Sequence, residues 1–276
     1  MKEKIAAAIT ALRRHKPLVH CLTNYVTANE CANAVLAVGG SPIMADAVEE
    51  AADITARAQA LVLNIGTLNA RTVAAMLVAG KKANELRIPV VFDPVGAGAS
   101  AYRGEVTAQI LREIRISILR GNQAELGFIA GINAETRGVD AAADTADSGI
   151  IAEKAAQKAN CIAVVTGKTD AVSDGEMTVK VINDTPRLCQ ITGTGCLLSA
   201  ITGAFAGAFF RENGARADMF TAGLSGVAAV NVAGARAEKR LTADGGRPGI
   251  GTFHVALFDE LSRLDGGAVR ETLALG

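Results

Sequence analysis

A loop of alternating glycine and threonine places a cysteine at the start of a long apolar segment. The loop lies in the run "ITGTGCLLSAITGAFAGAFF", where Gly193, Thr194 and Gly195 precede Cys196. A helix that begins here directs its free backbone N–H groups and the positive end of its dipole at whatever lies over the loop. Glycine lets a ligand approach the backbone closely. The segment therefore predicts an anion site, suited to stabilising charge while a phosphoryl group moves.

Cys196 itself has two interpretations. A helix N-terminus favours the thiolate, so this cysteine is a candidate nucleophile or base. Alternatively, it is a small, half-buried side chain at a crowded turn. Hydrolase chemistry of the Cys-His type is disfavoured, because His15, His20 and His254 all lie far from it in the sequence.

An aspartate ends an apolar run in "VVFDPVGAG". If this run is a strand, Asp93 lies at its carboxyl end, directly before Pro94. Such a carboxylate holds Mg²⁺ directly or through water, because that ion prefers oxygen ligands and retains several waters. It equally well caps a turn before proline, and position alone does not separate the two.

Two further apolar runs end in residues suited to nucleotide phosphates. In "ILRGNQAEL", Arg120 offers several donors to phosphate oxygens. Asn122 and Glu125 of the same run have the spacing of a helix capping box. In "AVVTGKTD", the Thr166 hydroxyl is a candidate phosphate contact, although a strand ending in Thr-Gly needs no function.

The N-terminal region offers candidates for a small polar ligand. In "HCLTNYVTANECANAVLAVGGSPIMAD", Asn24 can orient such a ligand and Met44 supplies an adaptable apolar wall. The alternative for both is a turn or core residue. The glycine-rich stretches match neither the phosphate-binding P-loop nor the dinucleotide fingerprint.

These candidates are positioned by elements that alternate in type along the chain. Short apolar runs bounded by Gly, Pro or Asp alternate with segments of helical periodicity, which is typical of βα units and a parallel sheet. The runs predict strands within 17–22, 41–45, 60–66, 88–95, 116–121 and 161–167. Helices are predicted over about 28–38, 47–59, 69–86, 104–114, 123–130, 148–159 and 251–264. Residues 170–183 predict a hairpin with an Asp-Gly turn, and the chain after 195 reads as almost entirely helical.

Composition limits the classes of function. The 276 residues have 50% hydrophobic content and a net charge of zero, and nothing marks a boundary within 1–276, so we expect a single domain. Without a basic face, nucleic acid is not an expected partner. Five scattered cysteines and the lack of an export signal predict reduced thiols in the cytoplasm. The apolar stretches 197–210 and 219–235 are predicted to be buried helices; the first, at 14 residues, is too short to span a membrane.

Taken in order along the chain, these motifs resemble the hydroxyethylthiazole kinase family of the ribokinase-like superfamily. The resemblance rests on "HCLTNYVTANECANAVLAVGGSPIMAD", "NIGTLN", "VFDPVGAGAS", "LRGNQAEL", "VTGKTDAVSDG" and "ITGTGC". It implies an α/β fold, a three-layer α/β/α sandwich with a mainly parallel central sheet. It also implies ATP-dependent phosphorylation of the hydroxyl of 4-methyl-5-(2-hydroxyethyl)thiazole in thiamine biosynthesis. A magnesium requirement and a cytoplasmic homotrimer with sites near subunit interfaces are further implications.

The resemblance also assigns roles to individual residues. It implies substrate contacts for Met44 and Gly193, with Asn24 in the same pocket by position. It implies ATP contacts for Arg120 and Thr166.

Roles in metal binding and catalysis are implied as well. Asp93 and Glu125 would organise magnesium and phosphate, which favours metal binding over capping for Glu125. Where ribokinase-like enzymes have GTGD, this sequence has GTGC, so Cys196 occupies the position of the base. We expect the backbone from Gly193 to Cys196 to contribute most and the thiol to help modestly. Alternatives are a kinase for another vitamin alcohol, such as hydroxymethylpyrimidine or pyridoxal, and a binding protein without turnover.

Overall fold

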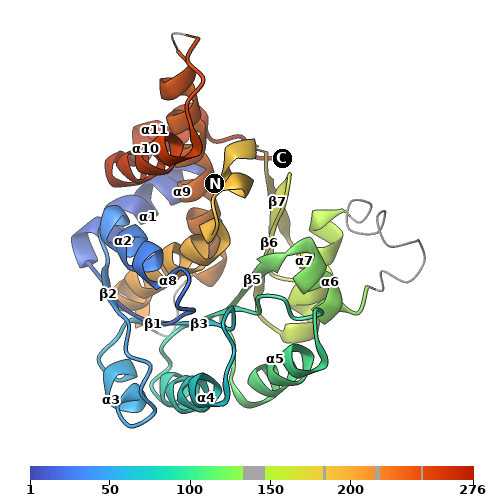
Figure 1. Ribbon diagram of the computed structural model, residues 1–276. Helices are drawn as coiled ribbons and strands as arrows, with labels where there is room; N and C mark the ends of the chain where they lie inside the picture. Colours follow the sequence, from blue (N-terminus) through green and yellow to red (C-terminus); the bar gives the residue numbers. More distant parts are fainter. Residues whose placement is uncertain (133–146, 183–184, 215–217, 244) are drawn as a thin grey trace.

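An eight-stranded sheet runs through the molecule (Figure 1). The computed structural model describes residues 1–132, 147–182, 185–214, 218–243 and 245–276. The strand order is β2-β1-β3-β4-β5-β6-β7-β8; the pairs from β2 to β6 are parallel, and β7 and β8 are antiparallel. The strands are β1 (Leu18–Leu22), β2 (Ser41–Ile43), β3 (Ala60–Asn64), β4 (Val90–Asp93), β5 (Ile118–Asn122), β6 (Ile162–Thr166), β7 (Asp170–Ser173) and β8 (Thr178–Val181).

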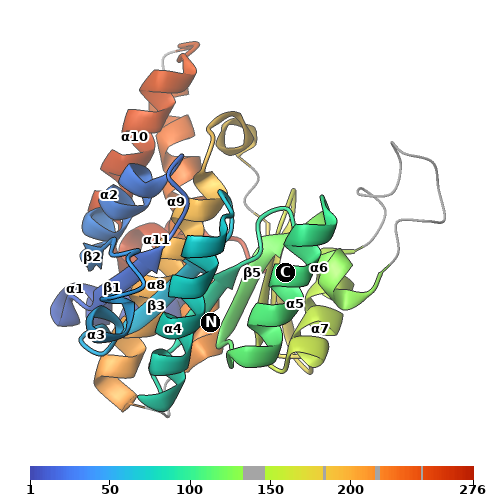
Figure 2. The same ribbon diagram turned by 60° about the horizontal axis from the view of Figure 1, so that its bottom comes forward.

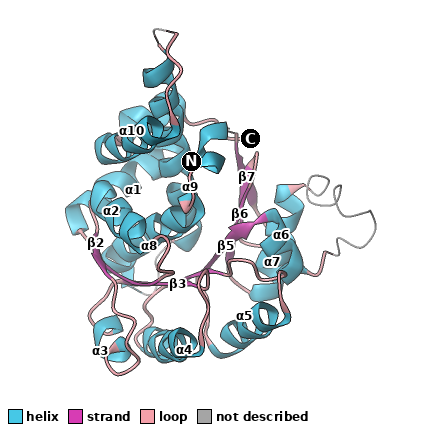
Figure 3. Cartoon of the chain, in the orientation of Figure 1, coloured by secondary structure: helices cyan, strands magenta, loops and turns pink. Residues whose placement is uncertain are grey.

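Helices cover both faces of this sheet (Figures 1 and 3). One face carries α3 (Ala51–Thr55), α4 (Ala70–Glu85), α5 (Ala101–Glu113), α6 (Gln123–Ala130) and α7 (Ser148–Ala159). The other carries α1 (Lys2–His15), α2 (Ala28–Val38), α8 (Thr194–Asn213), α9 (Met219–Thr242), α10 (Ile250–Arg263) and α11 (Gly266–Thr272). Figure 2 brings the face with α4 and α5 forward. The predicted three-layer α/β/α arrangement is confirmed.

Two hydrophobic cores explain why the strands are apolar on both sides. Val62 of β3 belongs to the core shared with α8 and α9, whereas its neighbours Leu61 and Leu63 belong to the core shared with α4 and α5. Successive side chains of a strand point to opposite faces of the sheet. A strand covered on both sides is therefore apolar at most of its positions. This is why the predicted strands lack a polar alternation.

Every predicted strand and the hairpin are present, and most helices are found within a few residues of their predicted bounds. The exceptions are short or terminal. The helix predicted over 47–59 is only Ala51–Thr55, because residues 47–50 form turns. The structure adds α11 and a 3₁₀ helix, η2 (Pro186–Gln190), which were not predicted. Residue 183, the last of the predicted hairpin, lies outside the described residues.

Helix α8 is the central helix of its layer. It has 20 residues rather than 14, so the length argument against a membrane span was wrong. Among the described residues it is the one helix long and apolar enough to cross a membrane, but 67% of its apolar window is buried inside the protein. Gly203 and Gly207 let it approach the sheet: a Cβ at Gly207 would lie 3.0 Å from Pro17. The prediction of a buried helix is confirmed.

The parallel strands end at a common edge, called the carboxyl edge below. The chain moves from β1 to β2 on one side and to β3 on the other, so the strand order reverses between β1 and β3. Ligands of open α/β sheets bind beyond the carboxyl ends of strands at such a reversal. Asn24 follows β1 and Asn64 ends β3, so the two side chains flank this point.

Candidate functional site

Side chains from four elements meet in a hydrogen-bonded cluster at the carboxyl edge. Asn64 lies at its centre: its Nδ2 donates to Asp93 Oδ2 (2.8 Å) and to Cys196 Sγ (3.2 Å). Its Oδ1 accepts from Asn24 Nδ2 (2.9 Å) and from the Gly66 amide (2.9 Å). Asn24 Nδ2 also donates to Cys196 Sγ at 3.3 Å. The cluster therefore holds a carboxylate and a thiol beside the start of α8.

Asp93 is fully buried, and its two carboxylate oxygens are in different situations. Oδ2 accepts from Asn64, from Ser199 Oγ (2.7 Å) and from Arg120 (3.4 Å). Oδ1 is buried without a hydrogen-bond partner among the described residues. Burial raises the pKa of Asp93, and the opposing charge of Arg120 only partly offsets this effect. No backbone amide of the described residues donates to the Asp93 side chain, so the predicted cap of a turn before Pro94 is not formed.

The thiol of Cys196 is half-buried in this cluster. Burial raises its pKa above the ordinary value, and the nearby charge of Asp93 raises it further. Hydrogen bonds from Thr27 and Asn64 act in the opposite direction without reversing the shift. The pKa of Cys196 is thus raised rather than lowered as expected, because burial and the Asp93 charge outweigh the hydrogen bonds and the charge of Arg120.

The first turn of α8 has no side-chain cap. Its N-cap is Gly193, in the left-handed region at φ 85°, and the first helical bond runs from the Leu197 amide to the Gly193 carbonyl. Among the hydrogen bonds of the described residues, none uses the amides of Thr194, Gly195 or Cys196. These N–H groups are available at the helix start, as the anion site predicted from the glycine-threonine loop requires.

Arg120 extends from β5 to the same helix end. Its Nη2 donates to Thr166 Oγ1 at 2.7 Å, and its Nε is buried without a partner among the described residues. A Cβ at Gly195 would lie 2.6 Å from Arg120 Nη1, so only glycine leaves room for this guanidinium. Arg120, Thr166 and Gly195 line a cavity of about 280 Å³, called the β5–β7 cavity below. The two predicted ATP contacts are thus brought together beside the uncapped helix.

Glu125 forms the predicted capping box at the start of α6. Its Oε2 accepts from the Asn122 amide (2.8 Å), and Asn122 Oδ1 accepts from the Glu125 amide (2.9 Å). Its Oε1 accepts from the Gly96 amide (2.8 Å), which fixes the loop after β4. The capping interpretation is confirmed. Metal binding by Glu125 must use the remaining lone pairs or a bridging water.

Comparisons with known proteins agree with this geometry. The model of the hydroxyethylthiazole kinase family matches residues 9–266. The chain belongs to this family. It is 49% identical over 266 residues to a hydroxyethylthiazole kinase of Ruminiclostridium cellulolyticum, covering 95% of this chain and 93% of the relative.

Solved structures show the same fold. A hydroxyethylthiazole kinase from Pyrococcus horikoshii is 35% identical and superposes with a TM-score of 0.85 over 99% of this chain and 98% of its own. A ribokinase-like superfamily protein from Enterococcus faecalis, at 10% identity, superposes with a TM-score of 0.60 over 96% of this chain and 95% of its own. This hydroxyethylthiazole kinase family member therefore has the ribokinase-like fold.

Met44 lies outside the hydrogen-bonded cluster. It follows β2 directly and is half-buried against the core on the α8 side. The β2 strand is separated from β3 by β1, so the two strands are about 10 Å apart. No hydrogen bond or ion pair of the described residues joins Met44 to the Asn64 cluster.

Sequence reasoning missed three residues that organise this family site. The sequence motifs assign no site role to Asn64 or Ser199. Arg103 was not singled out, yet its guanidinium donates to the carbonyls of Ile65 (2.7 Å), Val95 (2.6 Å) and Gly66 (2.8 Å). It thereby joins the loops after β3 and β4. A polar residue ending an apolar strand was the available signal for Asn64; nothing local marks Arg103.

The residues present fit a hard cation held by few protein ligands. No group of three or more His, Cys, Asp or Glu side chains able to hold a metal occurs in the described part of the chain. Mg²⁺ in kinase sites is held by one or two carboxylates, by water and by substrate phosphates, so such a group is not required. The unpartnered Asp93 Oδ1 is the observation that supports a cation at this point.

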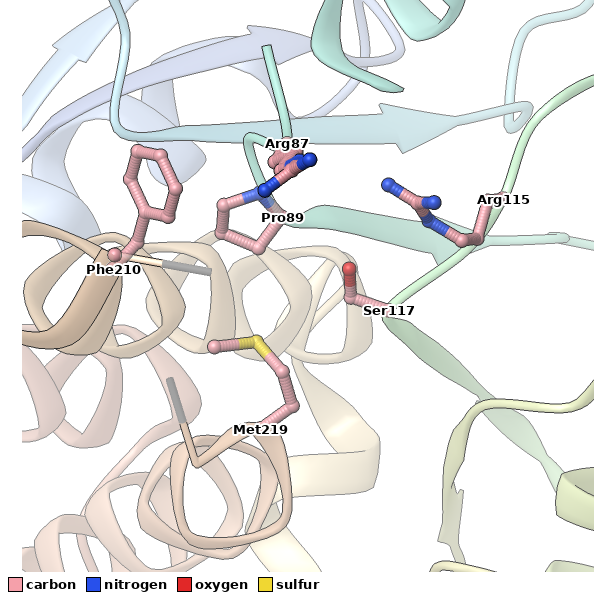
Figure 4. Close-up of a pocket in the computed structure, with 7 residues that line it drawn as sticks. Arg87, Pro89, Arg115, Ser117, Phe210 and Met219 are labelled. Carbon is pink, nitrogen blue, oxygen red and sulfur yellow. The ribbon is translucent and has the colours of Figure 1, made fainter. Parts of the chain in front are cut away.

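Another cavity, of about 360 Å³, lies at the opposite edge of the sheet (Figure 4). Pro89, just before β4, and Ser117, just before β5, line it together with Met219 at the start of α9. The side chains of Arg87 and Arg115 are drawn beside it. These residues precede the strands, whereas the Asn64 cluster lies where the strands end. The cavity and the cluster are therefore separated by the length of the strands.

Proposed function

We propose that this chain transfers the γ-phosphoryl group of ATP to the hydroxyl of 4-methyl-5-(2-hydroxyethyl)thiazole, giving the thiazole phosphate and ADP for thiamine biosynthesis. The observation that carries the proposal is the uncapped start of α8 between the Asn64 cluster and the Arg120–Thr166 pair. It supplies an anion site with polar side chains on one side and donors for phosphate on the other. Membership of the hydroxyethylthiazole kinase family supports the choice of alcohol.

Each side chain then has a stated role. Arg120 and Thr166 bind ATP phosphates, since a guanidinium and a hydroxyl at strand ends provide directed donors. The amides from Thr194 to Cys196 stabilise negative charge on the transferring group. Gly193, with Asn24 and Met44, contributes to the thiazole pocket.

Asp93 and Glu125 are proposed to organise Mg²⁺, Asp93 through its free oxygen and Glu125 through water. When bound, the ion neutralises charge on the ATP phosphates. The remaining lone pairs of Asp93 are held by Asn64 and Ser199, which keep the carboxylate pointed at the site.

Cys196 is proposed to position the substrate hydroxyl rather than to act as a strong base. Its raised pKa keeps the thiol protonated at neutral pH. Phosphoryl transfer with a loose transition state depends more on alignment and charge stabilisation than on deprotonating the nucleophile. A thiol held by two asparagine amides provides that alignment.

We further propose a single-domain cytoplasmic enzyme over residues 1–276 that assembles as a homotrimer and has neither nucleic acid nor membrane as a partner. Five free cysteines support a reducing compartment. Tyr25 (82% exposed), Leu36 (57%) and Val255 (63%) support an interface on the β1–α2 loop, α2 and α10. Because Tyr25 adjoins Asn24, such an interface would lie beside the thiazole pocket. The mass in solution tests the trimer.

The experiment is ADP release with Mg-ATP and hydroxyethylthiazole, run beside hydroxymethylpyrimidine and pyridoxal. Thiazole-dependent ADP release is expected. We expect Asp93→Asn to lower kcat by roughly 10²–10³-fold, the size of effect seen when one charge-stabilising group is lost, whereas the surface variant Asp259→Asn stays at the wild-type rate. If only hydroxymethylpyrimidine or pyridoxal is phosphorylated, that alcohol is the substrate and the thiazole is not. ATP binding without turnover of any alcohol would indicate a binding protein.

A further inference from the structure

The lining of the β5–β7 cavity is chemically mixed. Arg120, Thr166 and Gly195 line it together with Leu188, Val230 and Asn231. Asn231 lies on α9, and it contacts Asp170 at the start of β7. Along the sheet edge, β7 is four strands beyond β3, or roughly 19 Å from the Asn64 cluster. Arg120 lies on β5, two strands from β7, so a ligand whose phosphates contact Arg120 can extend along the cavity towards Asn231.

Hydrogen bonding fixes the orientation of the Asn231 amide. Its Nδ2 donates to Asp170 Oδ2 (2.6 Å) and to the Val227 carbonyl (3.2 Å), and both of these atoms are acceptors only. The reverse orientation would set the Asn231 oxygen against a carboxylate and a carbonyl. The two acceptors thus determine which atom of the Asn231 amide is the nitrogen, a choice that the shape of the side chain alone leaves open.

This leaves the Asn231 carbonyl oxygen as the unused group. The side chain is 6% exposed, and no hydrogen bond within the described part of the chain uses its Oδ1. Asp170 is itself anchored, because its Oδ1 accepts from the Gly167 amide at 2.9 Å. The cavity thus presents a rigid acceptor, held through Asp170 by the loop that follows Thr166.

Apolar side chains line the cavity that contains this acceptor. They are Leu188, Leu198 and Val230. A flat aromatic ring that carries a hydrogen-bond donor at its edge satisfies both features, because its faces bury apolar surface and its donor meets the buried oxygen.

We propose that Asn231 accepts a hydrogen bond from the exocyclic amine of adenine and makes this chain select 6-amino over 6-oxo purine nucleotides. The inference rests on the proposed function, whose ATP it places in the β5–β7 cavity. Adenine offers an amino donor at this position, whereas guanine and hypoxanthine offer a carbonyl acceptor. A carbonyl would face the Asn231 oxygen with no proton between them, and a buried unpaired acceptor costs about 1–3 kcal/mol.

The test is equilibrium binding to the wild-type protein with Mg²⁺ present and no thiazole. The probes are ATP, ITP, which differs by the 6-oxo group and the resulting N1 proton, and purine riboside triphosphate, which has hydrogen at that position. We expect Kd for ITP to be at least about tenfold higher than for ATP, with the unsubstituted purine between them. Equal Kd values for ATP and ITP, or binding of neither, would overturn the inference.

A variant separates recognition of the base from support of the fold. Asn231→Leu should bring the ITP to ATP ratio of Kd close to one, since the acceptor is gone. A purely structural role would weaken both nucleotides equally and leave the ratio unchanged. Ser225→Ala is the matched control, because Ser225 is buried on the same helix and does not line the cavity. If Asn231→Leu does not fold, the Kd values of the three nucleotides for the wild-type protein still test whether the 6-amino group is recognised.

The same measurements distinguish this inference from the proposed function. Selective ATP binding without phosphorylation of hydroxyethylthiazole would remove the proposed function and leave recognition of the base in place. Phosphorylation of the thiazole with equal Kd values for ATP and ITP would support the proposed function and remove recognition of the base by Asn231.

Discussion

Helices α6 and α8 both begin at the carboxyl edge of the sheet, yet their N-termini differ. At α6, Asn122 and Glu125 form a reciprocal capping box. At α8, the N-cap is Gly193 and no side chain caps the helix. Both ends carry the same partial positive charge. The difference shows that the N-cap residue decides whether this charge stabilises the fold or remains available to a ligand.

The local backbone explains why α8 stays uncapped. N-cap residues that bond their own helix usually have extended backbone angles, as Asn122 has at φ −78° and ψ 176°. Gly193 has φ 85°, where an L-residue is strained, and a side chain there would collide with Thr27. The glycine therefore fixes a conformation in which no side-chain cap forms.

The largest effect on activity should come from adding a side chain at the uncapped start of α8. In Gly195→Ala, the new methyl group would displace the Arg120 guanidinium, so we expect kcat/KM for ATP to fall by about 100-fold. The control is Gly127→Ala on α6, where an added Cβ meets nothing within 4 Å. That variant should keep its activity. Steady-state kinetics with varied ATP measure both, and an active Gly195→Ala enzyme would contradict the anion site.

At the capped helix, Glu125→Gln tests whether the capping residue also organises magnesium. Glutamine retains one acceptor but loses the charge, so we expect the Mg²⁺ concentration for half-maximal rate to rise by about 10- to 100-fold. The measurement is a magnesium titration of ADP release at saturating ATP. An unchanged titration would assign Glu125 to capping alone.

A smaller effect is expected from Cys196→Ala, about a tenfold decrease in kcat from lost alignment. Burial and the Asp93 charge raise the thiol pKa above its ordinary value, so the thiol should stay protonated from about pH 6 to pH 7.5. The pH profiles of kcat for the variant and the wild type should then run parallel over that range. A wild-type ionisation that disappears in Cys196→Ala would show that the thiol acts as a base.

The smallest effect is on stability. Asn122→Ala removes the α6 cap and should lower the free energy of unfolding by about 1 kcal/mol. Asn69→Ala is the matched control, because Asn69 forms a capping box with Thr72 at the start of α4. Urea unfolding should give similar losses for the two variants. A much larger loss for Asn122→Ala would mean that its helix start bears on the site as well as on the fold.

Local sequence patterns predicted most of the elements because most strands are bounded by turn residues and are buried on both faces. The prediction failed where local signals were weak. Residues 47–50 carry helix-compatible residues but form turns before α3. Helix α8 runs from Thr194 to Asn213 and so extends beyond the apolar stretch 197–210 at both ends, which is why its length was underestimated.

The sequence by itself determined the order of βα units, the strand-end positions of Asp93 and Thr166, and the glycine loop before Cys196. These follow from periodicity and turn chemistry, which act between near neighbours. Only the tertiary structure decided that Asn64 bonds both Asp93 and Cys196, and that Arg103 joins two loops. It also decided the direction of the thiol pKa. Hydrogen bonds between distant segments and the loss of water around a side chain depend on which strands become neighbours, and no local pattern contains that information.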